Sequence, residues 1–123
     1  MKIFLIFTIL FFATLPSLAA HKYPESFYQN QWCGRWHGKA EFELNDHCRV
    51  DCLTKNYAVE FDFAPKWAEA VGQSLHYGLK TGKKPAIILI LESKKDWVYY
   101  NRLKKICPLH GITLWYMVSP EFN

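Results

Sequence analysis

The sequence predicts a single domain of the α/β class, an α+β fold with a mixed sheet and the element order β-β-β-α-β-α-β. Residues 39–63 alternate between polar and apolar side chains, an apolar stripe at helical spacing follows Pro65, and a continuous apolar run fills residues 85–91. Alternation with a period of two indicates strands, whereas recurrence every three or four residues indicates a helix. Strands followed by a helix and a buried strand predict an antiparallel meander that grows into a mixed sheet.

The first twenty residues have the pattern of a secretory signal peptide. One lysine precedes an apolar run that ends in small residues at Ala20. The apolar run is short and early in the chain for a membrane span, and an uncleaved anchor is the alternative interpretation. We therefore expect a signal peptide at residues 1–20, a single domain at residues 21–123, and a secreted or periplasmic product without stable membrane association.

The charge balance is mildly basic, with 15 Lys and Arg against 11 Asp and Glu. Such a balance permits nucleic-acid binding without requiring it, because phosphate affinity depends on local clusters of Lys and Arg.

Acidic residues come into register when the strands around Asp51 are paired. Residues 48–53 and 58–63 read as two strands of a hairpin, and the pairing that keeps apolar residues on one face sets Asp51 opposite Glu60. The other expected pairs are Arg49 with Asp62, Val50 with Phe61, and Cys52 with Val59. Opposed side chains have Cβ atoms roughly 5 Å apart. Two carboxylates that close repel unless one is protonated or a cation lies between them.

The preceding strand, residues 39–44, extends this row. A three-residue loop at 45–47 places Phe42 opposite Val50 and brings Glu41 opposite Asp51. Glu41, Asp51 and Glu60 then form one row of oxygen ligands, which suits Mg²⁺ or Mn²⁺. The alternative is a solvated polar face with an ion pair between Arg49 and Asp62.

The helix after Pro65 is expected to run to Lys80 and to end at Gly82. Two neighbouring stripes run along it. The apolar stripe, predicted to be buried, is Trp67, Val71, Leu75 and Leu79, and the other stripe is Lys66, Ala70, Gln73 and Tyr77.

The remaining elements follow the same rules. Residues 85–91 predict a strand covered on both faces and parallel to the strand at 58–63. Residues 95–106 predict a helix, and residues 112–118 predict a last strand. A short helix is expected within residues 23–36.

The four cysteines predict two disulfides, because an even number in an exported chain favours pairing. Cys48 and Cys52 lie about 13 Å apart along one strand, and a disulfide needs Cα atoms within about 7 Å. Each must therefore take Cys33 or Cys107 as its partner. Zinc binding with His37 or His47 is the competing interpretation, but the spacing matches no closed zinc pattern.

The meander of acids, the Gln73-x-x-x-Tyr77 helix and the buried strand together resemble the PD-(D/E)XK, or restriction-endonuclease-like, nuclease superfamily. The resemblance covers about residues 39–91 and extends to small bacterial and phage proteins with this pattern. It implies that Asp51 and Glu60 bind Mg²⁺ or Mn²⁺ and activate water. It also implies that Gln73 and Tyr77, which look like the helix motif of RecB-type members, hold the site and the DNA.

One position departs from the superfamily pattern. Where a lysine is expected two residues after the glutamate, this chain has Asp62. Lys66 at the start of the next helix, or Asp62 itself, is expected to take that role. The predicted catalytic residues are Asp51, Glu60, Asp62, Lys66, Gln73 and Tyr77, and the predicted metal ligands are Glu41, Asp51 and Glu60.

The expected activity is Mg²⁺-dependent endo- or exonucleolytic cleavage of DNA by a secreted or periplasmic protein. The alternative is a non-catalytic secreted binding module on the same fold, for which the aromatic residues would supply a partner surface. These are Trp32, Trp36, Trp97, Tyr99, Tyr100, Trp115 and Tyr116. A metal-independent scaffold is the third interpretation.

Overall fold

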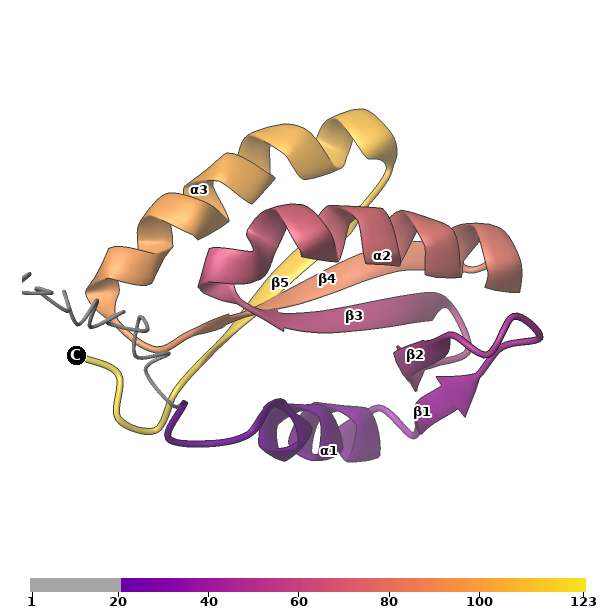
Figure 1. Cartoon of the computed structure of the whole chain (residues 1–123), viewed down its shortest axis with the longest axis horizontal. Helices are drawn as coiled ribbons and strands as arrows, with labels where there is room; N and C mark the ends of the chain where they lie inside the picture. Colours follow the sequence, from indigo (N-terminus) through magenta and orange to yellow (C-terminus); the bar gives the residue numbers. More distant parts are fainter. Residues whose placement is uncertain (1–20) are drawn as a thin grey trace, which may run out of the picture.

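The computed structural model of the protein describes residues 21–123, so the predicted signal peptide lies outside the described residues. The strands form one five-stranded sheet in the order β1-β2-β3-β4-β5 (Figure 1). The helices are α1 (Glu25–Arg35), α2 (Trp67–Thr81) and α3 (Trp97–Ile106), and the strands are β1 (Lys39–Glu43), β2 (Arg49–Leu53), β3 (Tyr57–Phe63), β4 (Lys84–Leu91) and β5 (Thr113–Val118). The predicted mixed sheet is confirmed, with β1, β2 and β3 antiparallel and β3, β4 and β5 parallel.

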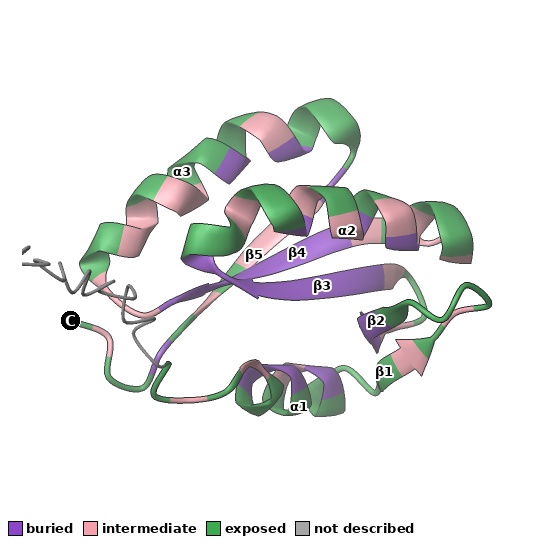
Figure 2. Ribbon diagram, in the orientation of Figure 1, coloured by how far each residue is buried: buried purple, intermediate pink, exposed green. Residues whose placement is uncertain are grey.

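The helices cover both faces of the sheet, with α1 on one side and α2 and α3 on the other (Figure 1). Alternate residues of β4 divide between two cores. Ile88 and Ile90 pack in the core that contains Tyr28 of α1, whereas Ile87 and Leu89 pack in the core that contains Leu103 of α3. This double burial explains why residues 85–91 are continuously apolar (Figure 2).

The predicted register of the meander is confirmed at the pairs that form. Phe42 lies opposite Val50, and Cys52 lies opposite Val59. The three-residue loop between β1 and β2 is also present, because the Leu44 amide donates to the carbonyl of Cys48 at 2.8 Å.

The expected pairing of Val50 with Phe61 on one face is wrong. The β2–β3 ladder includes Cys52 and Leu53, and its last pair toward the start of β2 is Cys52 with Val59. Beyond that pair the Phe61 amide donates to the Asp51 carboxylate at 2.7 Å instead of to a strand carbonyl. Val50 consequently packs with Tyr77 of α2, while Cys52 stays in the α1 core.

The buried side of α2 also differs from the prediction. Leu79 is 80% exposed and Leu75 is 37% exposed, whereas Ala70, Ser74 and Tyr77 are buried. The reason is close packing, since a Cβ atom at Gly78 would lie 3.1 Å from the Pro85 side chain. The large residues of β4 already fill the space below, so the helix approaches β4 through small residues such as Ala70 and Gly78, while Tyr77 is the large residue that it buries.

A disulfide joins Cys33 to Cys52, which is one of the two pairings allowed by the sequence. The Cα atoms are 5.8 Å apart, and the bond ties α1 to β2. Gly38 makes room for it, because a Cβ atom there would lie 2.4 Å from the Cys52 sulfur.

The predicted second disulfide, between Cys48 and Cys107, is wrong because both cysteines are free. Cys48 is exposed just before β2, whereas Cys107 is buried at the end of α3, in the core that contains Ile112 next to β5. Strands β3 and β4 separate β2 from β5 in the sheet, at about 4.8 Å per strand.

The two free thiols should differ in reactivity. We expect iodoacetamide to modify Cys48 in the folded protein and Cys107 only after denaturation, because burial raises the pKa of Cys107 to about 11 and shields it. Peptide mapping without reduction should recover a Cys33–Cys52 peptide. A Cys48–Cys107 peptide, or labelling of Cys107 before denaturation, would contradict this arrangement.

Candidate functional site

Asp51 and Glu60 meet where β2 stops pairing with β3. Both side chains are buried, with 9% and 4% of their surface exposed. Asp51 accepts a hydrogen bond from the Phe61 amide, and the charge of Asp51 raises the pKa of Glu60. One carboxylate raises the pKa of another in this way only when the two lie close together. The predicted proximity of these two residues is therefore confirmed.

The pair has an unsatisfied oxygen. Glu60 Oε2 is buried and has no hydrogen-bond partner. Burial first, and then the charge of Asp51, raises the pKa of Glu60 far above its ordinary value, while burial raises the pKa of Asp51. A buried carboxylate without a partner is costly, and a cation bound here would offset that cost and screen the repulsion between the two acids. The chemistry of these oxygen donors thus fits Mg²⁺ or Mn²⁺.

Asp62 adds a third buried carboxyl group, with 4% of its surface exposed. Burial raises its pKa to about 7, although the Lys66 ammonium opposes the shift. None of the ion pairs within residues 21–123 joins it to Arg49, which is exposed. The alternative of a solvated face with an Arg49–Asp62 ion pair is therefore wrong.

Glu25 of α1 joins this group, although nothing in the sequence pointed to it. Burial, together with the charges of Asp51 and Asp62, raises its pKa to about 7. Gln29, one turn later and buried, donates from Nε2 to Glu25 Oε1 at 2.8 Å. An acid in the first turn of a helix is ordinary in sequence, so only the packing of α1 identifies it.

Helix α2 places Tyr77 beside the carboxyl groups. Its side chain is 6% exposed, and burial together with the charges of Glu60 and Asp51 raises the pKa of its phenol. Gln73 lies half-buried one turn earlier on the same side of the helix. Gln73 and Tyr77 therefore both lie on the helix that covers the acids. Tyr77 is the one whose pKa is raised by the charges of the acids.

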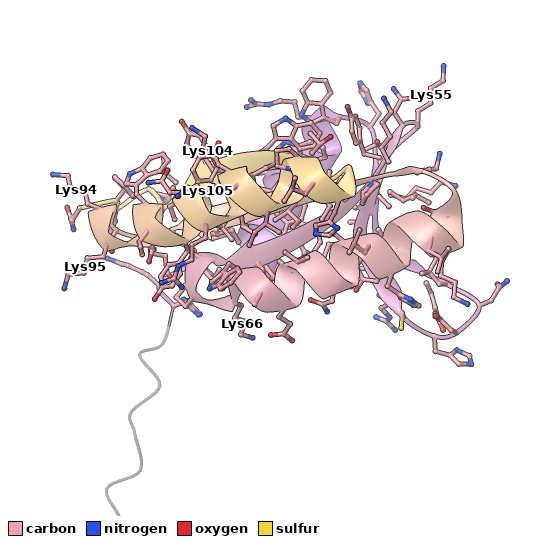
Figure 3. All side chains as sticks on the ribbon, turned by 90° about the horizontal axis from the view of Figure 1, so that it is seen from above. Lys55, Lys66, Lys94, Lys95, Lys104 and Lys105 are labelled. Atoms are coloured by element: carbon pink, nitrogen blue, oxygen red, sulfur yellow. A yellow bond between two sulfur atoms is a disulfide. The ribbon has the colours of Figure 1, made fainter. Side chains whose placement is uncertain are left out.

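Lys66 is the residue directly before the first turn of α2. Its side chain is exposed and points outward from the start of the helix (Figure 3). Its charge nevertheless lowers the pKa of both Asp62 and Glu25. The ammonium group thus acts on the two outer acids of the site from the solvent side.

Glu41 is the most peripheral of the predicted ligands. It is exposed and has a left-handed φ of 52°, and its charge raises the pKa of Asp51. Its carboxylate does not gather with those of Asp51 and Glu60 into a group of three with all ligand atoms within 4.8 Å. Among residues 21–123 that description applies to one set alone, Asp46, Cys48 and His76.

The set of Asp46, Cys48 and His76 joins the β1–β2 loop to α2. His76 Nε2 lies 2.7 Å from Asp46 Oδ2, and the other Asp46 oxygen accepts from the Cys48 amide at 3.1 Å. Lys80 Nζ lies 3.8 Å from Asp46 and competes for the same oxygen. The histidine beside Cys48 is therefore neither of the two considered from the sequence.

Comparison with known protein families, with curated proteins and with solved structures finds no match. Among the described residues, no helix combines the length and the apolar composition needed to cross a membrane.

The buried acids should make stability depend on pH. Asp and Glu ordinarily titrate near 4 in an unfolded chain, whereas in the folded chain the pKa values of Asp62 and Glu25 are about 7. Between these values the folded state binds more protons, so the free energy of unfolding falls as pH rises. In EDTA, we expect a higher melting temperature at pH 5 than at pH 8.

Neutral substitutions should remove part of this dependence. Asp51→Asn and Glu60→Gln should each raise the free energy of unfolding at pH 8 by roughly 1–2 kcal/mol, about one unit of relieved pKa shift. Glu43→Gln, at an exposed position on β1, should leave it unchanged. Destabilisation of both site variants in EDTA would show that the acids are not in mutual repulsion.

Proposed function

We propose that the protein is a secreted or periplasmic, metal-dependent nuclease that hydrolyses phosphodiester bonds of DNA. The observation that carries the proposal is the buried pair of Asp51 and Glu60, in which Glu60 Oε2 has no partner. If the two acids had only a structural role, neutral side chains in their place would give a more stable protein. A pair that holds a cation during catalysis has a reason to keep both charges.

The ligand set for Mg²⁺ or Mn²⁺ in this proposal is Asp51 and Glu60, with Glu41 as an outer member. Such a metal would lower the pKa of a bound water and neutralise charge that develops on the phosphate. The Phe61 amide holds one oxygen of Asp51 at 2.7 Å and thereby fixes the direction of the other. A rigid strand edge is the kind of support that a metal ligand needs.

The surrounding residues have distinct roles in the proposed reaction. Lys66 would neutralise negative charge on the phosphate and orient the attacking water, because its ammonium lies near Asp62 and Glu25 on the solvent side. With a pKa of about 7, Asp62 can accept a proton from water near neutral pH. Tyr77 and Gln73 would support the site through hydrogen bonds.

The alternative of a non-catalytic binding module keeps one specific observation in its favour. Trp32, Trp36 and Trp115 line a cavity of about 610 Å³ that lies apart from the carboxylates. The two functions separate experimentally, because a cation that binds only the folded state raises the melting temperature. No shift with Mg²⁺ or Mn²⁺ at pH 8 would favour the binding module.

The proposed metal ligands should be required for cleavage. With plasmid, linear and single-stranded DNA and with RNA as substrates, the oxidised mature chain should cleave DNA in Mn²⁺ and not in EDTA. Asp51→Asn and Glu60→Gln should each lower the rate by at least about 100-fold, since even outer-shell partners of metal ligands are worth about 10–100-fold. Glu43→Gln is the matched control. Cleavage at the wild-type rate by either site variant would exclude the proposed site.

Lys66 should act on the chemical step. We expect Lys66→Ala to lower kcat about tenfold or more with little change in KM, because an interaction made only in the transition state appears in kcat. Lys66→Arg keeps the charge and should retain part of the rate. An unchanged kcat in Lys66→Ala would assign the role to Asp62.

A further inference from the structure

An aromatic cleft lies on the α1 side of the sheet and takes no part in the carboxylate site. The cavity has a volume of about 610 Å³ and is lined by aromatic residues of α1, β3 and β5. Trp32 is at its centre, with ring centroids 5.8 Å from Trp36 and 5.6 Å from Trp115, and Tyr57 lies 5.0 Å from Trp115. A cavity of this size holds a ligand of several rings.

The most accessible aromatic side chain that lines the cleft is a tryptophan. Trp36 is 60% exposed, although it belongs to a cluster of four aromatic rings. Trp32 and Trp115 are half-buried below it and are packed against the α1 core. A rigid floor of indole rings with one exposed ring at its edge is the arrangement that stacks a flat, unpaired base.

The polar part of the lining comes from the β2–β3 turn. Thr54, Lys55 and Asn56 complete the cavity, and none of the described residues that line it is acidic. Lys55, Asn56 and Tyr57 also line a second recess, whose other residues include Lys83 and Lys84. Lys83 Nζ donates to the Lys55 carbonyl at 2.7 Å, which holds one ammonium group at this turn. The cleft therefore continues directly into a basic recess.

The lysines of α3 and of the turn before it do not share this setting. Figure 3 shows Lys94 and Lys95 at the opposite end of the molecule from Lys55, with Lys104 and Lys105 along α3. Of the lysines labelled there, Lys55 at the β2–β3 turn is the one that lines the aromatic cleft. Stacking surface beside positive charge is complementary to a polyanion with accessible rings, whereas a neutral sugar would leave the lysines without a partner.

We propose that this cleft binds a single-stranded segment of nucleic acid, with bases stacked on Trp36 and its neighbours and the backbone phosphates along Lys55, Lys83 and Lys84. The proposal takes its class of partner from the proposed function but does not depend on the carboxylates. Glu60 shares the α2 side of β3 with Ala58, whereas the cleft residue Tyr57 packs in the α1 core. Binding and cleavage are thus separable.

The test is binding in EDTA by the mature Glu60→Gln chain, in which cleavage is disabled. A fluorescent thymidine oligonucleotide of about ten residues should bind with quenching of tryptophan emission, and more tightly than a duplex of equal length. Trp36→Ala should weaken binding about fivefold or more, since stacking of one base is worth at least that factor. Trp36→Phe should retain most of the affinity, and Leu79→Ala, at an exposed position on α2, should not change it.

Lysine variants supply a second measurement, which is independent of whether the Trp36 variants fold. Lys55→Ala should lower the dependence of log affinity on log salt by about 0.7, the value for one phosphate contact in a single strand. Lys95→Ala removes the same charge at the opposite end and should leave that slope unchanged. Equal slopes for the two variants, a preference for duplex, or binding of a neutral oligosaccharide instead of the oligonucleotide would overturn the proposal.

The outcomes also separate the two proposals. Loss of binding in Trp36→Ala without any cleavage by the wild type would support the cleft and refute the nuclease. Cleavage by the wild type together with undiminished binding by Trp36→Ala would support the nuclease and refute the cleft.

Discussion

The hydrogen bond from the Phe61 amide to the Asp51 carboxylate is the interaction on which the rest of the structure depends. A strand amide normally donates to a carbonyl of the neighbouring strand. Here a side chain takes that place, so β2 parts from β3 after the Cys52–Val59 pair. The separation turns Val50 toward α2. Glu60 stays paired with Ile87 of β4, and on the β2 side Asp51 is the neighbour whose charge acts on it. The interruption of the β2–β3 ladder therefore shapes the fold and also brings Asp51 close to Glu60.

Much of this fold follows from residue patterns. The continuous apolar run of β4 predicted a strand covered on both faces, and the alternation around Phe42 and Cys52 predicted the register. The pattern could not show that the ladder stops at Asp51, because an acidic residue that caps an amide looks the same in sequence as one that faces solvent. The predicted burial of Leu75 and Leu79 is wrong for a related reason. Hydrophobicity ranks residues by burial, whereas the close approach at Gly78 selects small ones.

The candidate site was predictable only in part. Asp51 and Glu60 followed from strand pairing, and Tyr77 followed from the resemblance to a helix motif. Glu25 did not, since its proximity to Asp62 is set by the packing of α1 on the sheet, a contact between segments far apart in the chain. The cysteines show the same limit. Strand geometry excluded a Cys48–Cys52 bond, but only the positions of β2 and α3 in space show that Cys48 and Cys107 lie too far apart.

The Cys33–Cys52 disulfide connects the parts of the molecule that the two proposals use. Cys52 follows Asp51 directly, and Cys33 lies on the helix that carries Glu25 and Trp32. A nuclease is a hazard to the genome of the cell that makes it. In a reducing cytosol the bond does not persist, so the helix would not be covalently attached to the strand of the site. In the proposed secreted nuclease this bond would form only where oxidation is possible, and export would double as protection of the producing cell.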